Sequence, residues 1–220
     1  MSAQPLEAIE IETAPNPTAC IIWMHGLGAD GGDFAPLAGE IAMPVATRYI
    51  FPHAPMMPVT INGGYVMRAW YDISDAAIRR EDESGVRASQ GLIENLLARE
   101  KSRGVRAENI VLAGFSQGGA MALHAGLRFP DRLAGLVALS CYLALDRTLE
   151  AERAAANRGT PIFMAHGTAD PVVPFEFGDS SRRFLQGEDH PVEWHTYPIA
   201  HGVAPEEIDD IRVFLERVLP

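Results

Sequence analysis

The sequence predicts an α/β fold in which helices cover both faces of a doubly wound, mostly parallel sheet. Uniformly apolar runs of strand length recur along the chain, with Ala19–Met24 (ACIIWM) as the clearest example. Strands of a parallel sheet look like this because helices bury them on both faces. Segments with apolar residues at helical spacing separate these runs. No internal repeat or linker interrupts the 220 residues, so we expect one domain over residues 1–220.

The strands expected in this sheet begin with an edge strand and continue as buried runs. Leu6–Glu12 alternates apolar and polar residues, which is typical of a half-buried edge strand. The further expected strands are residues 19–24, 48–51, 110–113, 133–139, 161–165 and 192–197. Between the strand at 48–51 and Trp70, residues 52–67 are expected to form a long, irregular apolar loop.

The expected helices are recognised by apolar spacing and by the residues that begin or end them. Asp33 can cap the first helix, and Gly104 follows the end of the second. The last helix carries one apolar face, made of Ile208, Ile211, Leu215 and Val218. In chain order, the expected helices cover residues 33–42, residues 82–102, the segment after Ser116, residues around 147–157, a segment opened by Pro174, and the last segment of the chain.

Composition and charge exclude several classes of partner. The 29 acidic residues outnumber the 18 Lys and Arg residues, which gives a net charge of −11 and argues against nucleic acids and anionic membrane surfaces. No apolar run approaches the roughly 18 residues of a membrane span, so we expect no integral membrane association. The first residues show no signal peptide, and two Cys do not make a disulfide framework. We therefore expect a cytoplasmic protein.

The stretch from Asn109 to Phe129 carries the strongest functional signal. An apolar run leads into Gly114-Phe115-Ser116-Gln117-Gly118, and small apolar residues that suit a buried helix follow. With 9 Ser and 20 Gly in the chain, chance predicts roughly 0.07 matches to this Gly-x-Ser-x-Gly pattern. A tight turn built from small residues is the plain alternative. Because the strand and helix contexts are both present, we interpret Ser116 as a nucleophile on a strained elbow.

A serine nucleophile needs a base within hydrogen-bond reach, and the base needs a group that orients it. Of seven His, His201 lies between the last strand and the last helix, where the order Ser, Asp, His places the base in this architecture. Asp170 follows a buried strand and precedes Pro171, so taken alone it could equally be a turn residue. The chain order favours Ser116, Asp170 and His201 as a catalytic triad.

The glycine-rich loop HGLGADGG, residues 25–32, admits two interpretations. Gly26, Gly28 and Gly31 match the dinucleotide-binding pattern, which also requires an acidic residue at the end of the next strand. That strand ends in Ile50-Phe51-Pro52-His53 and offers no carboxylate. The alternative is an oxyanion hole, in which backbone N–H groups near Leu27 and the N–H of Gln117 face one oxygen atom. We adopt the oxyanion hole.

Apolar residues on two segments could form an acyl groove. The segment between residues 56 and 70 is rich in Met, which adapts to ligands of varied shape, but it could equally pack as core. The loop after the strand at 133–139, residues 141–145, could form the opposite wall. The candidate substrate-binding residues are Met67, Trp70 and Leu143.

Together these motifs resemble the phospholipase/carboxylesterase family, which includes bacterial carboxylesterases and acyl-protein thioesterases. The spacings of 54 residues from Ser116 to Asp170 and 31 from Asp170 to His201 also match it. The resemblance implies an α/β-hydrolase fold without a separate lid domain, and it places the oxyanion donors on Leu27 and Gln117. A departure is Cys141, where many members have Gly. The matching residues are His25-Gly26-Leu27-Gly28, Pro52-x-Ala54-Pro55, Pro58-Val59-Thr60, Trp70-Tyr71-Asp72, Gly114–Gly119, His166-Gly167 with Asp170, and His201-Gly202.

The predicted chemistry is acyl transfer to water from a small-molecule ester or thioester. It requires no cofactor and no metal: His25, His53 and His166 are not at metal-ligand spacing. A serine carboxylesterase for short- to medium-chain esters is our first hypothesis. The alternative is an acyl-protein thioesterase or lysophospholipase on the same triad, and a non-enzymatic ligand receptor is the third. The sequence leaves open whether the chain forms a homodimer.

Overall fold

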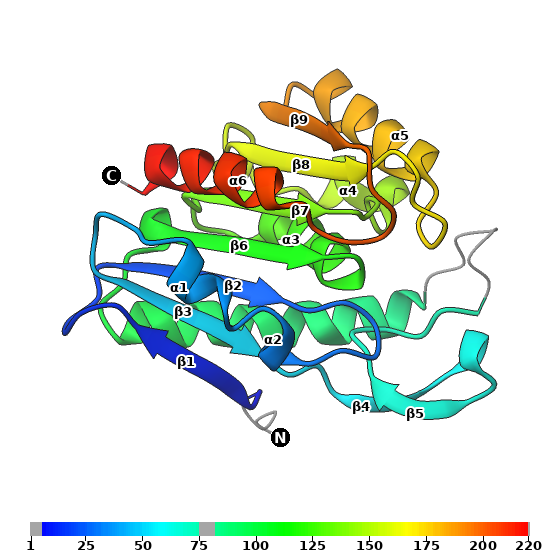
Figure 1. Ribbon diagram of the computed structural model, residues 1–220, viewed down its shortest axis with the longest axis horizontal. Coiled ribbons are helices and arrows are strands. Elements are labelled where there is room, and N and C mark those ends of the chain that lie inside the picture. The colour runs from blue at the N-terminus through cyan, green and yellow to red at the C-terminus, as the bar shows by residue number, and fades with distance from the viewer. Residues whose placement is uncertain (1–5, 75–81, 220) are drawn as a thin grey trace.

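The computed structural model describes residues 6–74 and 82–219 and confirms the doubly wound sheet (Figure 1). Within these residues the main sheet has seven strands in the order β1-β3-β2-β6-β7-β8-β9. All neighbours are parallel except β1, which pairs antiparallel with β3 at the edge. The strands are β1 (Ala8–Glu12), β2 (Ala19–Met24), β3 (Thr47–Pro52), β6 (Ile110–Phe115), β7 (Gly135–Leu139), β8 (Ile162–Gly167) and β9 (Val192–Tyr197).

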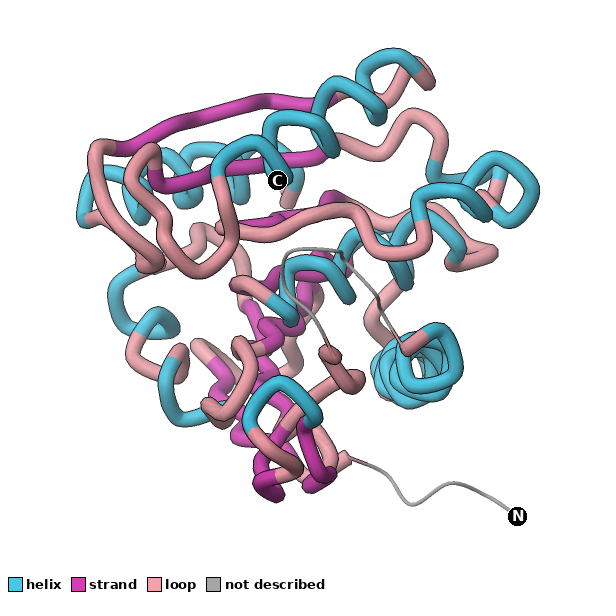
Figure 2. Tube along the Cα trace, turned by 90° about the vertical axis from the view of Figure 1, so that its right-hand side faces the viewer, coloured by secondary structure: helices cyan, strands magenta, loops and turns pink. Residues whose placement is uncertain are grey.

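Helices cover both faces of this sheet, as Figure 2 shows from the side. Side chains alternate along each strand, so β6 sends Ile110 and Leu112 to one face and Val111 and Ala113 to the other. The first face packs against α2, α3, α4 and α5, and the second against α1 and α6. The helices are α1 (Leu37–Glu40), α2 (Glu83–Ser102), α3 (Gln117–Arg128), α4 (Asp146–Glu152), α5 (Phe175–Gly187) and α6 (Pro205–Val218).

The helix predicted over residues 33–42 is wrong in its extent. The chain forms a short 3-10 turn at Gly31–Asp33 and then α1, which has a single turn. Asp30, not Asp33, caps the 3-10 turn, because its Oδ1 accepts a 2.6 Å hydrogen bond from Gly32 N–H. Pro36 lacks a backbone donor and Gly39 favours the unfolded chain, so a longer helix does not form. The helix predicted around 147–157 is likewise shorter, since α4 ends at Glu152.

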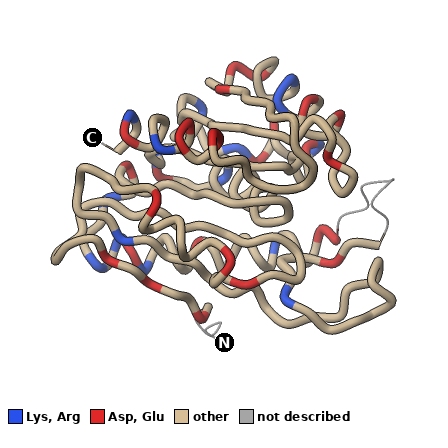
Figure 3. Tube along the Cα trace, in the orientation of Figure 1, with Lys and Arg blue, Asp and Glu red and all other residues tan. Residues whose placement is uncertain are grey.

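The irregular loop predicted over residues 52–67 is also wrong. It contains an antiparallel hairpin, β4 (Met56–Val59) with β5 (Tyr65–Arg68), joined by a 3-10 turn at Thr60–Asn62. The hairpin projects beyond the carboxyl end of the main sheet (Figure 1). Figure 3 draws it almost wholly uncharged, with Arg68 as its single charged residue.

The candidate site residues gather at the carboxyl ends of the parallel strands. The loops that follow β2, β6, β7, β8 and β9 leave from the same edge of the sheet, and this is where ligands bind in doubly wound folds. The glycine-rich loop, Ser116, Asp170 and His201 all lie in these loops. Among the described residues, no helix is long and apolar enough to cross a bilayer.

Candidate active site

Ser116 lies between β6 and α3 in a backbone conformation that few residues adopt. Its φ is 55° and its ψ is −121°, outside the regions that L residues favour. A Cβ on Gly114 would overlap the backbone of Gly118, and a Cβ on Gly118 would overlap the carbonyl of Met24. Both positions therefore require glycine. The strand, strained turn and helix predicted for the nucleophile elbow are present.

Asp170 and His201 meet beside this elbow. His201 Nδ1 lies 2.7 Å from Asp170 Oδ2, and the Asp170 side chain is fully buried. A carboxylate only accepts, so Nδ1 donates and the neutral ring keeps Nε2 as its acceptor. The imidazole packs on the ring of Phe115, the residue before Ser116, with 4.6 Å between ring centroids. The structure thus brings the predicted base and its orienter together and packs the base on the residue that precedes the predicted nucleophile.

The turn after β8 holds the Asp170 carboxylate from its other side. Oδ1 accepts from Val172 N–H at 2.8 Å and from Val173 N–H at 2.9 Å. His166 Nε2 donates to the Val173 carbonyl at 2.9 Å and lies 3.5 Å from Asp170 Oδ2. Burial lowers the pKa of His166, so this ring is neutral near neutral pH. No feature of the sequence predicted the proximity of His166 to Asp170.

The glycine-rich loop packs against the other side of Ser116. A Cβ on Gly26 would lie 3.4 Å from the Ser116 Cβ, so the loop backbone contacts the elbow directly. Gly28, at a φ of +77°, donates from its N–H to the Arg68 carbonyl at 2.9 Å. Within the described residues, no hydrogen bond leaves the N–H of Leu27, which lies between these glycines. A free donor at this point is what an oxyanion hole needs.

His25 fixes the start of this loop from inside the protein. Its ring is fully buried, and burial lowers its pKa. Nδ1 donates to the Gly26 carbonyl at 2.7 Å, which leaves Nε2 to accept from Ala54 N–H at 3.0 Å. The neutral imidazole therefore ties the glycine-rich loop to the segment that leads into the hairpin.

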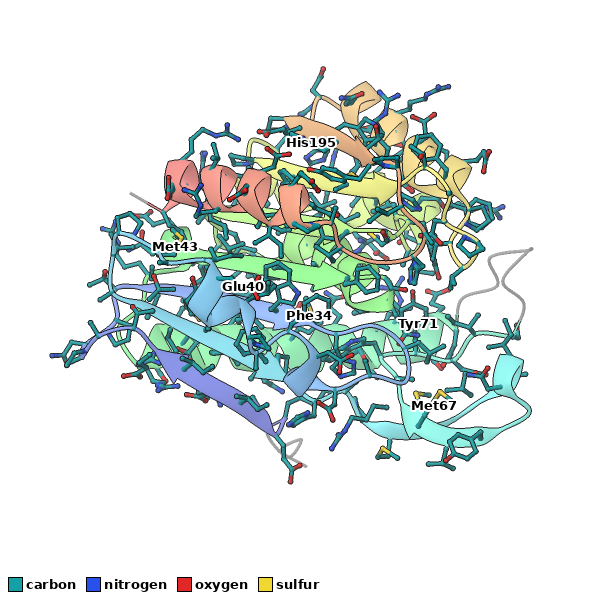
Figure 4. The ribbon with its side chains drawn as sticks, in the orientation of Figure 1. Phe34, Glu40, Met43, Met67, Tyr71 and His195 are labelled. Carbon is teal, nitrogen blue, oxygen red and sulfur yellow. The ribbon has the colours of Figure 1, made fainter. Side chains whose placement is uncertain are left out.

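The three candidate substrate-binding residues lie at different depths. Met67 is half-buried, and its sulfur lies 3.5 Å from where a Cβ on Gly28 would be, at the edge of the glycine-rich loop. Figure 4 labels it on β5, with Tyr71 between the hairpin and the end of the sheet. Trp70 and Leu143 are each only 1% exposed. The structure therefore places Met67 partly exposed beside the glycine-rich loop, and it buries Trp70 and Leu143 in the interior.

A family model described as Phospholipase/Carboxylesterase matches residues 6–219. The chain belongs to this family. Among similar proteins, acyl-protein thioesterase 1 of Gibberella zeae is 39% identical over 232 residues, covering 100% of this chain and 99% of that protein. Acyl-protein thioesterase 1 of Neurospora crassa is 40% identical over 215 residues, covering 92% and 88% of the two chains.

Solved structures agree with this assignment to the phospholipase/carboxylesterase family. The crystal structure of Arabidopsis thaliana SOBER1 is similar with a TM-score of 0.87 and 30% identity, covering 92% of this chain and 99% of that one. Zea mays acyl-protein thioesterase 2 gives a TM-score of 0.85 at 28% identity, covering 97% and 99%. The chain is therefore a hydrolase of the esterase and thioesterase class with an α/β-hydrolase fold.

Cys141, the departure from the phospholipase/carboxylesterase pattern, packs against the first turn of α3. A Cβ on Gly119 would lie 2.9 Å from its sulfur, so the thiol fills the space beside this glycine. The side chain is 1% exposed, and burial raises the pKa of the thiol. A buried, protonated thiol is a poor nucleophile, so Cys141 acts here as a packing residue. Among the described residues, no three His, Cys, Asp or Glu side chains gather as a metal site would require.

Proposed function

We propose that this hydrolase is an acyl-protein thioesterase that cleaves fatty acyl thioesters through an acyl-enzyme on Ser116. The contact that carries the proposal is the 2.7 Å hydrogen bond between Asp170 and His201, beside a serine held at a φ of 55°. Relatives named acyl-protein thioesterase 1 align with nearly the whole chain at 37–40% identity, which favours thioester over generic ester hydrolysis.

In this mechanism His201 Nε2 takes the Ser116 proton while Oγ attacks the carbonyl carbon of the thioester. Negative charge develops on the carbonyl oxygen, where the N–H groups of Leu27 and Gln117 face it. Each such donor is worth about 3 kcal/mol of transition-state stabilisation. The C–S bond then breaks, and His201 returns the proton to the leaving thiolate. Water attacks the acyl-enzyme with the same base, releasing the carboxylic acid and free Ser116.

We place the acyl chain between the β4–β5 hairpin and the loop after β7. Met67 lies at the entrance, next to Gly28, and Trp70 and Leu143 support the walls from below. The hairpin exposes further apolar side chains, which an acyl chain can cover: Met56 (58% exposed), Ile61 (43%), Tyr65 (70%) and Val66 (53%). The proposal treats the chain as one catalytic domain, which the family match over residues 6–219 supports.

A carboxylesterase for short- to medium-chain esters is the second candidate function. The chain is similar to esterase PE8, with a TM-score of 0.84 and 25% identity over 98% of this chain. The triad chemistry is the same for both candidates, so the leaving group and the chain length distinguish them. Lysophospholipid hydrolysis is a third outcome of the same test.

A substrate panel separates these candidates. Matched thioesters and p-nitrophenyl esters of increasing acyl length, an S-acylated peptide and a lysophospholipid are compared by kcat/KM. We expect the long-chain thioester and the S-acylated peptide to be turned over best. A preference for short esters with no turnover of the acylated peptide would identify a carboxylesterase instead.

The same panel run on Met67→Trp tests the acyl groove. The larger ring should shift the preference toward shorter chains, with each lost methylene contact worth about 0.8 kcal/mol, or roughly a fourfold change. Met43→Trp is a matched control, because Met43 is also half-buried but packs on the sheet face that α1 and α6 cover, and Figure 4 labels it at the other side of the molecule from Met67. If both variants keep the wild-type profile, Met67 does not line the groove.

A further inference from the structure

The side chain of Gln117, the residue after Ser116, is buried and bonded at both ends of its amide. It is 3% exposed. Oε1 accepts from Trp70 N–H at 2.8 Å, and Nε2 donates to the Tyr71 carbonyl at 2.8 Å. The first residue of α3 therefore holds the backbone of a segment 46 and 47 positions earlier in the chain. The acyl-transfer mechanism uses only the backbone N–H of this residue, so it leaves the amide side chain without a role.

The Trp70 indole continues the connection to the glycine-rich loop. Nε1 donates to the His25 carbonyl at 2.9 Å, and the two rings pack with 5.5 Å between centroids. The His25 carbonyl belongs to the peptide that precedes Gly26 and Leu27. A continuous set of buried groups, Gln117, Trp70 and His25, thus joins the two segments that supply the proposed oxyanion donors.

The precision required of an oxyanion hole gives this connection a purpose. Two donors must both lie 2.7–3.1 Å from one oxygen atom in the transition state. Leu27 and Gln117 come from the loops after two different strands, and small shifts of one loop would misplace one donor. A misplacement on the order of 1 Å can cost about 100-fold in rate. Buried polar groups resist such shifts, because a displaced partner leaves a donor or acceptor unsatisfied in the interior.

We propose that the Gln117 side chain is a positioning residue that, through Trp70 and His25, sets the spacing between the Leu27 and Gln117 oxyanion donors. This inference rests on the proposed acyl-transfer function. It gives Trp70 a task different from lining the acyl groove, since its indole N–H is used inside the protein.

The test replaces the side-chain amide and keeps the backbone N–H. Gln117→Met preserves the size and removes both hydrogen bonds, while Trp70→Phe removes the indole donor. We expect kcat to fall about 10- to 100-fold with KM changed less than about twofold. Affinity for a long-chain trifluoromethyl ketone, which forms a tetrahedral oxyanion on the serine, should fall by the same factor as kcat/KM. Affinity for the fatty acid product should not change.

Gln90→Met is the matched control, because its amide oxygen lies 2.9 Å from the buried ring of His124, between α2 and α3 and away from the elbow. It should keep wild-type kcat. If Gln117→Met does not fold, Trp70→Phe carries the test, because it keeps both backbone partners of the Gln117 amide and removes only the indole hydrogen bond to His25.

Two results would overturn the inference. One is a kcat within twofold of wild type in the Gln117 and Trp70 variants. The other is an equal loss of substrate, product and ketone affinity, which would indicate damage to the groove. Failure of the proposed function is distinguishable, because the Ser116→Ala protein would then retain turnover whatever the Gln117 variants do.

Discussion

The two sides of Ser116 are held in different ways. One side carries Asp170 and His201, and we call it the acid side after the Asp170 carboxylate. There Asp170 is fixed by N–H groups two and three residues further along the chain. The other side carries the proposed oxyanion donors, and we call it the oxyanion side. There Gln117 is hydrogen-bonded across 47 residues to Trp70, and Trp70 is hydrogen-bonded across 45 residues to His25. The first arrangement is a turn that forms locally. The second exists only when the sheet and the segment after β5 are assembled, so it depends on the whole fold.

This comparison predicts unequal losses when each side is broken, and the acid side should lose more. In Asp170→Asn the turn can keep its N–H bonds, but the amide group facing His201 favours the wrong imidazole tautomer. We expect a loss of about 10⁴ in kcat with normal folding. The Gln117 and Trp70 variants should lose only about 10- to 100-fold in kcat, which is a loss about 100 to 1,000 times smaller.

Asp189→Asn is the control for the acid side. Asp189 has a side chain that is 85% exposed and a φ of 62°, a conformation that Asn also tolerates. Steady-state kinetics on one ester should give near wild-type rates for this variant. Near wild-type kcat in Asp170→Asn together with a loss in Asp189→Asn would mean that the orienting carboxylate is misassigned.

A smaller effect concerns the segment that carries His201 into α6. Glu207 Oε2 accepts from Ala204 N–H at 3.1 Å, while Oε1 is buried without a partner among the described residues. Burial raises the pKa of Glu207 from 4.5 to about 7, against the opposing hydrogen bond from Ala204. The folded protein thus binds this proton more tightly than the unfolded chain does. The resulting stability is complete below about pH 4.5 and is lost as the pH rises through about 7.

Urea unfolding at pH 5 and pH 8 measures this contribution. Between the two values the wild type should lose up to about 3 kcal/mol of unfolding free energy that Glu207→Gln does not lose. Glu206→Gln, at the exposed neighbouring position, should follow the wild type. Equal pH dependence in the wild type and Glu207→Gln would contradict this account. It would show that burying Glu207 beside the His201 segment does not change the unfolding free energy with pH.

The comparison also explains which parts of the fold were predictable from the sequence. The bounds of β2 and β9 match the expected residues 19–24 and 192–197, because hydrophobic runs and alternation are patterns within a few neighbouring residues of the sequence. The β4–β5 hairpin was missed, since much of it is exposed and Pro58 argues against a strand. The first helix was overextended because apolar spacing outweighed Pro36 and Gly39.

The candidate site follows the same division. A local motif and the chain order predict Ser116, Asp170 and His201 as the triad, and the structure brings Asp170 and His201 into contact. The hydrogen bonds between the Gln117 side-chain amide and the Trp70–Tyr71 backbone leave no sequence signal, because every non-proline residue carries the same backbone donor and acceptor. His166 is similar: its approach to Asp170 depends on how the turn after β8 folds back.

The most direct test of the proposed mechanism is covalent labelling of Ser116. The wild type is treated with an alkyl fluorophosphonate, and the adduct is located by mass spectrometry while thioester hydrolysis is followed. The account predicts one adduct, on the peptide that contains Ser116, formed in step with the loss of activity, and no adduct or turnover in Ser116→Ala. An adduct on another residue, or undiminished turnover by Ser116→Ala, would contradict it.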